Sequence, residues 1–189
     1  MNKVIILLVF ICVFFSGCNK NNQNSNYETN SMVTIETAYN TVTIDAFKKK
    51  YNATVANENI KINNWTEKMP GIVEYSFNNQ ITLSLGISPN EKNLVHIPQL
   101  FSNIVEISKI DNFPEILYGI LKVEDDTVTL EQAEIVADKI SLDQSEMMMI
   151  DLPYNVFSKK EIVNNIVIDV SYLDKKLGIM FYDVNMIEQ

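Results

Sequence analysis

Hydrophobic residues recur every three or four positions in three stretches of the chain, and this spacing predicts three amphipathic helices. Thr43 can cap the first helix, and Asn112 with Pro114 marks the start of the second. Thr129 and Gln132 have the spacing of a capping box at the start of the third. The positions predicted to be buried are Ile44, Phe47, Tyr51 and Val55 in the first helix, Ile116, Leu117, Ile120 and Leu121 in the second, and Leu130, Ala133, Val136, Ala137 and Ile140 in the third.

Apolar and polar residues alternate in other stretches, and this alternation predicts half-buried β-strands. Asn78-Asn79 joins two such runs into a hairpin, and Asp174-Lys175-Lys176 joins two more near the C-terminus. One or two further strands are expected between Leu94 and Ile110, although Pro98 interrupts them. The alternating apolar positions are Val73, Tyr75, Phe77, Ile81, Leu83, Leu85 and Ile87 in the first pair, and Ile166, Ile168, Val170, Tyr172, Leu177, Ile179 and Phe181 in the second.

The order of these elements places helical sequence before a hairpin in each half of the chain. This order predicts an α+β fold in which an antiparallel sheet carries its helices on one face. Two such helix-hairpin halves are what a divergent duplication would leave, but their residue-level similarity does not establish one. Because 47% of the 189 residues are hydrophobic, the chain can bury a core, and we assign one domain to residues 39–189.

The most specific motif lies in the first eighteen residues. Lys3 precedes 12 uninterrupted apolar residues, Val4 to Phe15, which is within the range of a signal-peptide hydrophobic core and too short to span a bilayer. The sequence Phe15-Ser16-Gly17-Cys18 follows, with small residues directly before a cysteine. This motif resembles the lipobox of bacterial lipoproteins, although Phe15 stands where leucine is commonest. Residues 1–17 are therefore predicted to be a lipoprotein signal peptide.

The resemblance implies diacylglyceryl attachment to the Cys18 thiol and cleavage after Gly17. Acyl chains on Cys18 would anchor the protein to a membrane, facing the periplasm or the cell surface, without spanning it. In Gram-negative members of the family an aspartate after the lipidated cysteine favours the inner membrane, so Asn19 implies the outer membrane if the host has one. An ordinary buried cysteine behind a conventional cleavable signal remains the alternative.

A polar segment follows the cysteine. Six of the twelve residues from Asn19 to Asn30 are asparagine, and such a composition buries too little surface to offset its ordering entropy. We therefore interpret residues 18–38 as the lipidated cysteine and a flexible tether. The element order of the body, with Phe47 to Asn52 near its start, is loosely similar to small exported bacterial lipoproteins that lack an assigned activity. That resemblance bears on the fold and not on a mechanism.

The charge of the chain disfavours nucleic acids as partners. All 15 basic residues are lysines, so the bidentate fork that recognises phosphates and base edges is missing, and the 24 acids give a net charge of −9. Lys48 to Lys50 form the one basic triplet, which we interpret as a solvated helix face. The five glycines are widely separated and form no nucleotide-binding loop. We expect no cofactor and neither nucleic acid nor nucleotide among the partners.

Motifs for catalysis and metal binding are weak. His96 is the single histidine and is expected to be a partly buried strand residue, and Ser158 with Lys160 lies on a lysine-rich segment interpreted as a turn. Glu124-Asp125-Asp126 is better explained by helix-terminal charge than by calcium, since it lacks the spacing of an EF-hand loop. Met147-Met148-Met149 is better explained by core filling than by copper(I). We predict a protein without catalytic or metal-ligating residues.

Trp65 is the candidate binding residue, because tryptophans in loops are often interface hot spots; covering the edge of the core is the alternative. Three functions remain open. The first is a membrane-tethered, non-enzymatic module that binds an envelope component through an exposed sheet face or the Trp65 loop. The second is an immunity or inhibitor lipoprotein whose acidic surface neutralises a cationic toxin or envelope hydrolase. The third is an envelope hydrolase that uses acidic residues, although no motif nominates them.

Overall fold

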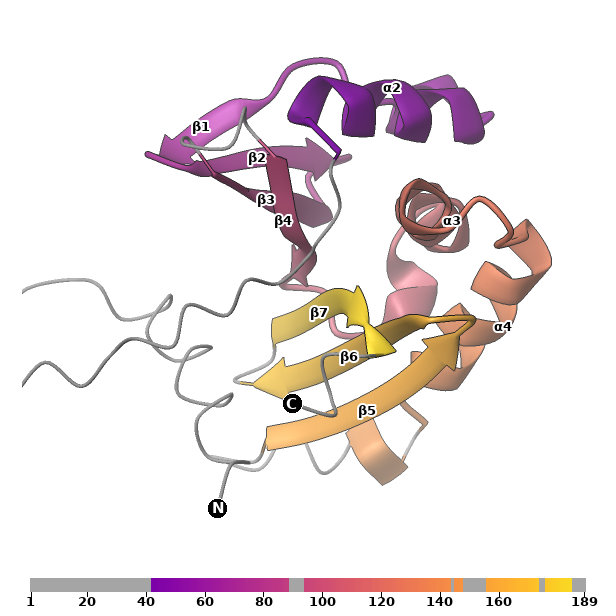
Figure 1. The fold of residues 1–189 in the computed structure, drawn as a ribbon. Helices are drawn as coiled ribbons and strands as arrows, with labels where there is room; N and C mark the ends of the chain where they lie inside the picture. The colour runs from indigo at the N-terminus through magenta and orange to yellow at the C-terminus, as the bar shows by residue number, and fades with distance from the viewer. Residues whose placement is uncertain (1–41, 89–93, 144, 148–155, 174–175, 185–189) are drawn as a thin grey trace, which may run out of the picture. The chain divides into compact units, whose positions relative to one another are not determined.

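The computed structural model describes residues 42–88, 94–143, 145–147, 156–173 and 176–184 (Figure 1). These residues all belong to one structural unit, Thr37–Gln189. The fold class is α+β, as predicted. The helices are α2 (Ile44–Thr54), α3 (Phe113–Glu124) and α4 (Leu130–Ile140), and 3-10 turns cover Glu58–Ile60 and Ile107–Lys109. The strands are β1 (Thr66–Met69), β2 (Ile72–Phe77), β3 (Ile81–Ser88), β4 (Leu94–Ser102), β5 (Val156–Val163), β6 (Ile166–Leu173) and β7 (Lys176–Asp183).

The seven strands form one antiparallel sheet in the order β1-β2-β3-β4-β7-β6-β5. Two meanders, β1 to β4 and β5 to β7, meet where β4 pairs with β7 over four residues, from Gln99 opposite Met180 to Ser102 opposite Leu177. Each half of the chain is therefore helical sequence followed by a meander, which is more extensive than the hairpin expected from the alternation.

All three helices lie on one face of the sheet, as predicted (Figure 1). Helix α3 packs against both α2 and α4 and is the most deeply buried of the three. The residues that fill the space between helices and sheet include the predicted positions Phe47, Tyr51, Val73, Phe77, Leu83, Ile116, Ile120, Val136, Ile140, Ile168, Tyr172 and Ile179. The helical and alternating patterns thus identified the core-facing positions of both layers.

Local sequence explains where several elements begin and turn. The Thr43 hydroxyl accepts a hydrogen bond from the Ala46 N–H at 3.2 Å, which caps α2 as expected. Asn78 and Asn79 both adopt positive φ, 51° and 56°, and asparagine tolerates this conformation better than other side chains. The predicted turn between β2 and β3 is confirmed. The second predicted turn includes residues 174 and 175, which lie outside the described residues.

The prediction for Leu130 was wrong, since this side chain is 41% exposed. At about 100° per residue, Leu130 lies at the margin of the stripe that Ala133, Val136, Ala137 and Ile140 form, instead of within it. The interruption predicted at Pro98 appears in the pairing and not in the strand: β4 runs from Leu94 to Ser102, but its register with β3 shifts between the Leu85–Pro98 pair and the Ile87–Val95 pair. The pairing of β4 with β7 begins only at Gln99, so the missing N–H of Pro98 removes no ladder bond on that side.

The interpretation of Ser158 and Lys160 as part of a turn was wrong as well, because both lie in β5. This strand has charged residues on both of its faces, so its sequence does not alternate. Lys159 and Glu161 sit opposite the core residues Val170 and Ile168 of β6, on the helix-covered side of the sheet. Helix α4 supplies polar partners for both side chains, which makes these positions compatible with a strand.

Candidate interaction site

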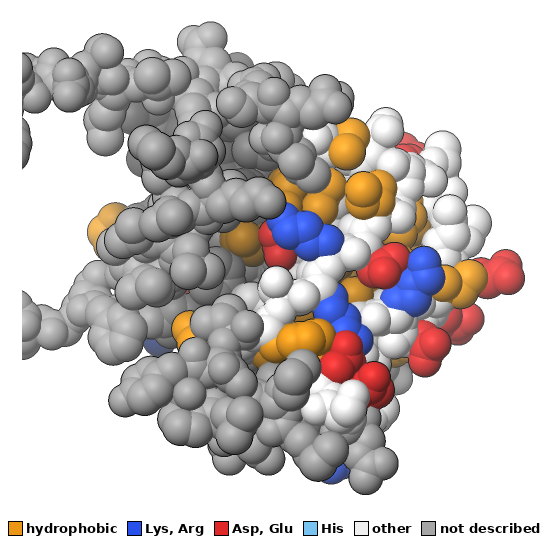
Figure 2. Space-filling model, turned by 90° about the horizontal axis from the view of Figure 1, so that it is seen from below, with side chains coloured by type: hydrophobic (Ala, Val, Ile, Leu, Met, Phe, Trp, Pro, Cys, Tyr) orange, Lys and Arg blue, Asp and Glu red, His pale blue; other side chains and the backbone are white. Residues whose placement is uncertain are grey.

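The outward face of α4 combines acidic residues with an exposed hydrophobic residue. Glu131, Glu134, Ile135 and Asp138 are all exposed, at the i, i+3, i+4 and i+7 spacing of one helix face, and Ile135 is 50% exposed. The buried stripe of the same helix lies on the other side. On the side where Figure 1 has α4, Figure 2 shows hydrophobic surface with acidic and lysine side chains around it. We call these four residues the α4 face.

The carboxylates of the α4 face have no ion-pair partners within the described ranges. The neighbouring Lys139 is directed to another acid: its Nζ lies 3.0 Å from Glu161 Oε2 on β5. Lys159 and Lys160 on β5 are likewise paired with Glu146 and Asp169, each at 2.7 Å. These three lysines therefore neutralise other acids, and none of them forms an ion pair with the α4 face.

The N-terminal end of α4 is fixed by a capping box. The Thr129 hydroxyl accepts a hydrogen bond from the Gln132 N–H at 3.2 Å, and Gln132 Oε1 accepts one from the Thr129 N–H at 2.9 Å. Two of the N–H groups that a helix start leaves unpaired are satisfied in this way. The first turn, which carries Glu131, is thereby held in helical geometry.

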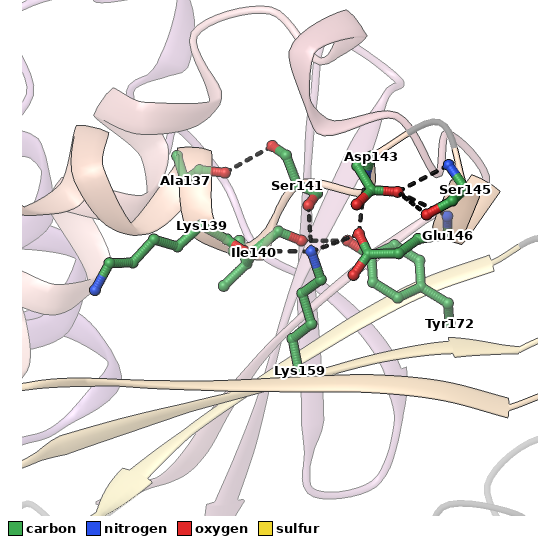
Figure 3. A network of polar contacts seen from close by, with 9 residues as sticks. All are labelled: Ala137, Lys139, Ile140, Ser141, Asp143, Ser145, Glu146, Lys159 and Tyr172. Carbon is green, nitrogen blue, oxygen red and sulfur yellow. Dashed lines mark hydrogen bonds and ion pairs between the residues drawn. The ribbon is translucent and has the colours of Figure 1, made fainter.

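The C-terminal end of α4 is fixed by Lys159 (Figure 3). The Lys159 ammonium group donates hydrogen bonds to the carbonyl oxygens of Ser141, at 2.5 Å, and Lys139, at 3.4 Å. The Tyr172 hydroxyl from β6 donates to the Ile140 carbonyl at 2.7 Å. A cation at a helix C-terminus interacts favourably with the helix dipole and with carbonyl groups that lack helical partners.

A short loop completes this network behind Lys159. Glu146 pairs with Lys159 and also accepts the Asp143 N–H at 2.8 Å, while Asp143 Oδ1 accepts hydrogen bonds from the N–H groups of Ser145 and Glu146. The hydrogen bond from the Glu146 backbone, followed by that from the Ser145 side chain, lowers the pKa of Asp143. The carboxylate therefore stays ionised, and the network anchors α4 to β5 and β6. Held at both ends, α4 presents its exposed side chains on a rigid support.

Trp65 lies just before β1 and is half-buried. Its ring meets those of Phe47 and Tyr75 edge-on, with centroids 6.4 Å apart in both pairs. Its indole N–H is buried and has no hydrogen-bond partner among the described residues. The structure therefore places most of the Trp65 ring in an aromatic cluster at the margin of the core, apart from the residues of the α4 face.

Ser158 and Lys160 are both exposed on β5, but Lys160 is occupied. Its Nζ lies 2.7 Å from Asp169 Oδ2 and donates to the Tyr182 hydroxyl at 2.9 Å. Burial lowers the pKa of Lys160, but the hydrogen bonds with Asp169 and Tyr182 outweigh it, and the net pKa is raised. A lysine that stays protonated is a poor general base for Ser158.

The acids at the end of α3 are directed to separate partners. Asp126 pairs with Lys50 of α2 at 2.7 Å, and Asp125 accepts hydrogen bonds from Thr127 and from Asn164 in the β5–β6 turn. In the part of the chain that the structure describes, no three His, Cys, Asp or Glu side chains come close enough to hold a metal ion. Lys50 thus links α2 to the end of α3, which corrects the interpretation of the whole basic triplet as a solvated helix face.

Several sequence candidates lie partly or wholly outside the described residues. Cys18 and residues 1–38 do so entirely, and so do Met148 and Met149, while Met147 packs at the margin of the core. The backbone of His96 belongs to β4, but its side chain is not described. The α4 face was missed by sequence reasoning, although one observation pointed to it. At helical spacing, Ile135 falls among acids on the side of the helix opposite the predicted stripe.

No family model matches the chain, and neither the curated proteins nor the solved structures compared with it contain a match. Within the described ranges, every helix is too short or too polar to cross a bilayer.

Proposed function

We propose that this protein is a membrane-anchored bacterial lipoprotein that acts as a non-enzymatic interaction module in the cell envelope. The observation that carries the proposal is the leader: Lys3, the apolar residues 4–15, and the small residues that directly precede Cys18. Two or three acyl chains on Cys18 would hold the body at a membrane surface, since each buried methylene contributes about 0.8 kcal/mol. The Asn-rich segment would give the body reach from that anchor.

The body supports a binding role better than a catalytic one. The one lysine placed beside a serine on β5 is engaged by Asp169 and Tyr182, and the acids at the end of α3 diverge to different partners. In contrast, α4 has a rigid, exposed face that nothing in the described chain neutralises or covers. Surfaces of this kind contribute to recognition more than to chemistry.

An immunity or inhibitor lipoprotein is the second candidate, and the unpaired carboxylates of the α4 face favour it. Glu131, Glu134 and Asp138 would attract a cationic toxin or hydrolase. Removal of residues 1–17 loses Lys3 and no acid, so the side-chain charge of the processed protein would be 14 − 24 = −10. The two candidates share the anchor and the binding role and differ in the identity of the partner.

In-cell chemical cross-linking in the native host, read by mass spectrometry, tests the proposal. The full-length protein is compared with Cys18→Ser, which cannot be lipidated, and with Cys12→Ser, a matched control inside the leader. We expect a stoichiometric partner that depends on Cys18 and not on Cys12. The identity of that partner would separate an envelope component from a toxin or hydrolase. Absence of any partner, with the wild type recovered in membranes, would contradict the binding role in both forms.

A further inference from the structure

We propose that the α4 face is a docking surface for a basic protein, one that presents lysine and arginine side chains around an apolar socket. The inference rests on the proposed binding function and specifies its surface and partner. Ile135 would enter the socket, and Glu131, Glu134 and Asp138 would pair with the surrounding cations. Residues at this spacing form the contact stripe when a helix is laid into a partner's groove.

The position of Ile135 is the first observation that supports this surface. One exposed isoleucine is ordinary on a protein surface. Ile135, however, lies opposite the buried stripe of α4, at half exposure, and with carboxylates one turn away on either side. Such an apolar centre with a charged border is the arrangement found in protein interfaces, where a buried anchor is ringed by polar groups.

Charge selects the partner. Three carboxylates without ion pairs in the described chain repel nucleic acids and anionic lipid headgroups and attract cationic protein surfaces. A second copy of this chain is a poor occupant, because a two-fold contact through α4 would bring acid against acid. The net charge of −9, with no arginine, makes the rest of the chain a poor match for the α4 face as well.

Pre-organisation is the second observation. The capping box at Thr129 fixes one end of α4, and Lys159 and Tyr172 fix the other. A partner that binds a helix held in this way does not have to order it, so less of the binding free energy is lost to conformational entropy. The network around Lys159 therefore supports the docking surface without contacting the partner.

Site-specific photo-cross-linking of the full-length protein in its native host tests the surface. A photoreactive residue is introduced as Ile135→p-benzoylphenylalanine, and the matched control is Ile162→p-benzoylphenylalanine. Ile162 is also an isoleucine, is 57% exposed, and lies on β5 instead of α4. We expect a covalent adduct with a basic protein from position 135, and roughly tenfold less of it from position 162, because only position 135 lies within the proposed contact.

Charge reversal provides the second arm. Glu131→Lys, Glu134→Lys and Asp138→Lys are combined with the photoreactive residue at 135, and the control combination is Asp45→Lys, Glu67→Lys and Glu74→Lys. Both combinations change the net charge equally, and Asp45 matches Glu131 as an acid in the first turn of a helix. We expect the adduct to fall about tenfold in the first combination and to change less than about twofold in the control. If the lysine variants do not accumulate in the cell, each glutamate is replaced by glutamine and each aspartate by asparagine at the same positions.

Several outcomes would overturn the docking surface. They are an adduct with an acidic protein, with a second copy of the chain or with lipid, equal adducts from positions 135 and 162, and an adduct that survives the first combination. Lack of an adduct at 135 while chemical cross-linking still captures a Cys18-dependent partner refutes this surface and leaves the proposed function standing. Lack of a partner in both experiments refutes both the docking surface and the proposed function.

Discussion

Gly119 of α3 lies directly against the ring of Tyr51 of α2. A Cβ atom at residue 119 would be 2.4 Å from Tyr51 Cε2 and 2.9 Å from Val55 Cγ1. Tyr51 is fully buried and its ring stacks on Phe47, so it has no room to yield. The close approach of the two helices therefore requires glycine at this position, although glycine inside a helix costs about 1 kcal/mol relative to alanine.

We expect Gly119→Ala to destabilise the protein by about 1–3 kcal/mol, because overpacking outweighs the gain in helix propensity. Unfolding by urea, followed through the fluorescence of Trp65, measures the change. Tyr51→Leu supplies the control, since it shortens the side chain that the new methyl group would meet. The double variant is expected to lose less stability than the sum of the two single variants. Strict additivity would show that the clash with Tyr51 is not the cause.

Two fully buried tyrosines form a matched pair for a second prediction. The Tyr172 hydroxyl donates to the Ile140 carbonyl at 2.7 Å, whereas the Tyr51 hydroxyl has no partner among the described residues. Burial raises the pKa of both side chains above the ordinary range of tyrosine, so both hydroxyls stay protonated. The changes in the free energy of unfolding caused by removing each hydroxyl should therefore differ only through the one hydrogen bond, which Tyr172 makes and Tyr51 does not.

We expect Tyr172→Phe to cost about 1 kcal/mol, because the Ile140 carbonyl is left without its donor. Tyr51→Phe should leave the free energy of unfolding unchanged or raise it, since an unpartnered hydroxyl is removed from the core. Denaturant midpoints of the two variants, measured side by side, check the difference. A larger loss for Tyr51→Phe would reveal a partner for that hydroxyl, such as a buried water.

Lys159 is expected to contribute more to stability than an ordinary surface lysine. Its side chain is 20% exposed, and its partner Glu146 is 19% exposed. Lys159→Met removes the hydrogen bonds to the end of α4 and leaves Glu146 without its counter-ion, for an expected loss of about 1–3 kcal/mol. Lys109→Met is the control, because the Lys109–Glu106 pair is exposed at 65% and 40% and should be worth less than about 1 kcal/mol. Thermal unfolding of both variants gives the comparison.

Local rules were sufficient where a residue's role depends on its immediate neighbours. Thr43 and Thr129 were identified as helix caps from sequence, and both make the expected hydrogen bonds. Asn78-Asn79 was identified as a turn for the same kind of reason. The helical and alternating periods then gave the antiparallel sheet with helices on one face, because each period determines which side chains face the core.

Local rules failed where a distant element supplies the partner. Strand β5 was missed because Lys159 and Glu161 break the alternation of apolar and polar residues, and their partners on α4 and at Glu146 come from other parts of the chain. The same contacts between β5 and the end of α4 provide the rigid support for the α4 face. The candidate site was therefore missed together with the strand. Ile135 alone carried a usable sequence pattern, an apolar residue on the polar side of a predicted helix.

Glu124, at the end of α3, should make stability depend on pH. Burial raises the pKa of its carboxyl to about 7 from an ordinary value of 4.5, against the opposing effect of Lys50. Between these two pH values the folded chain binds more protons than the unfolded chain, so this group makes the protein less stable as pH rises. Asp125 affects stability in a separate, lower pH range, since hydrogen bonds from Thr127 lower its pKa below 3.8.

We therefore expect Glu124→Gln to be more stable than the wild type at pH 8, by about 1–3 kcal/mol, and closer to it at pH 5. Urea unfolding at the two pH values measures this, and subtracting the wild-type result at each pH removes the contribution of every other titrating group. Glu67→Gln is the control, because it removes the same charge from an exposed position on β1. An equal difference between Glu124→Gln and the wild type at pH 5 and pH 8 would mean that Glu124 ionises normally. The end of α3 would then be open to water.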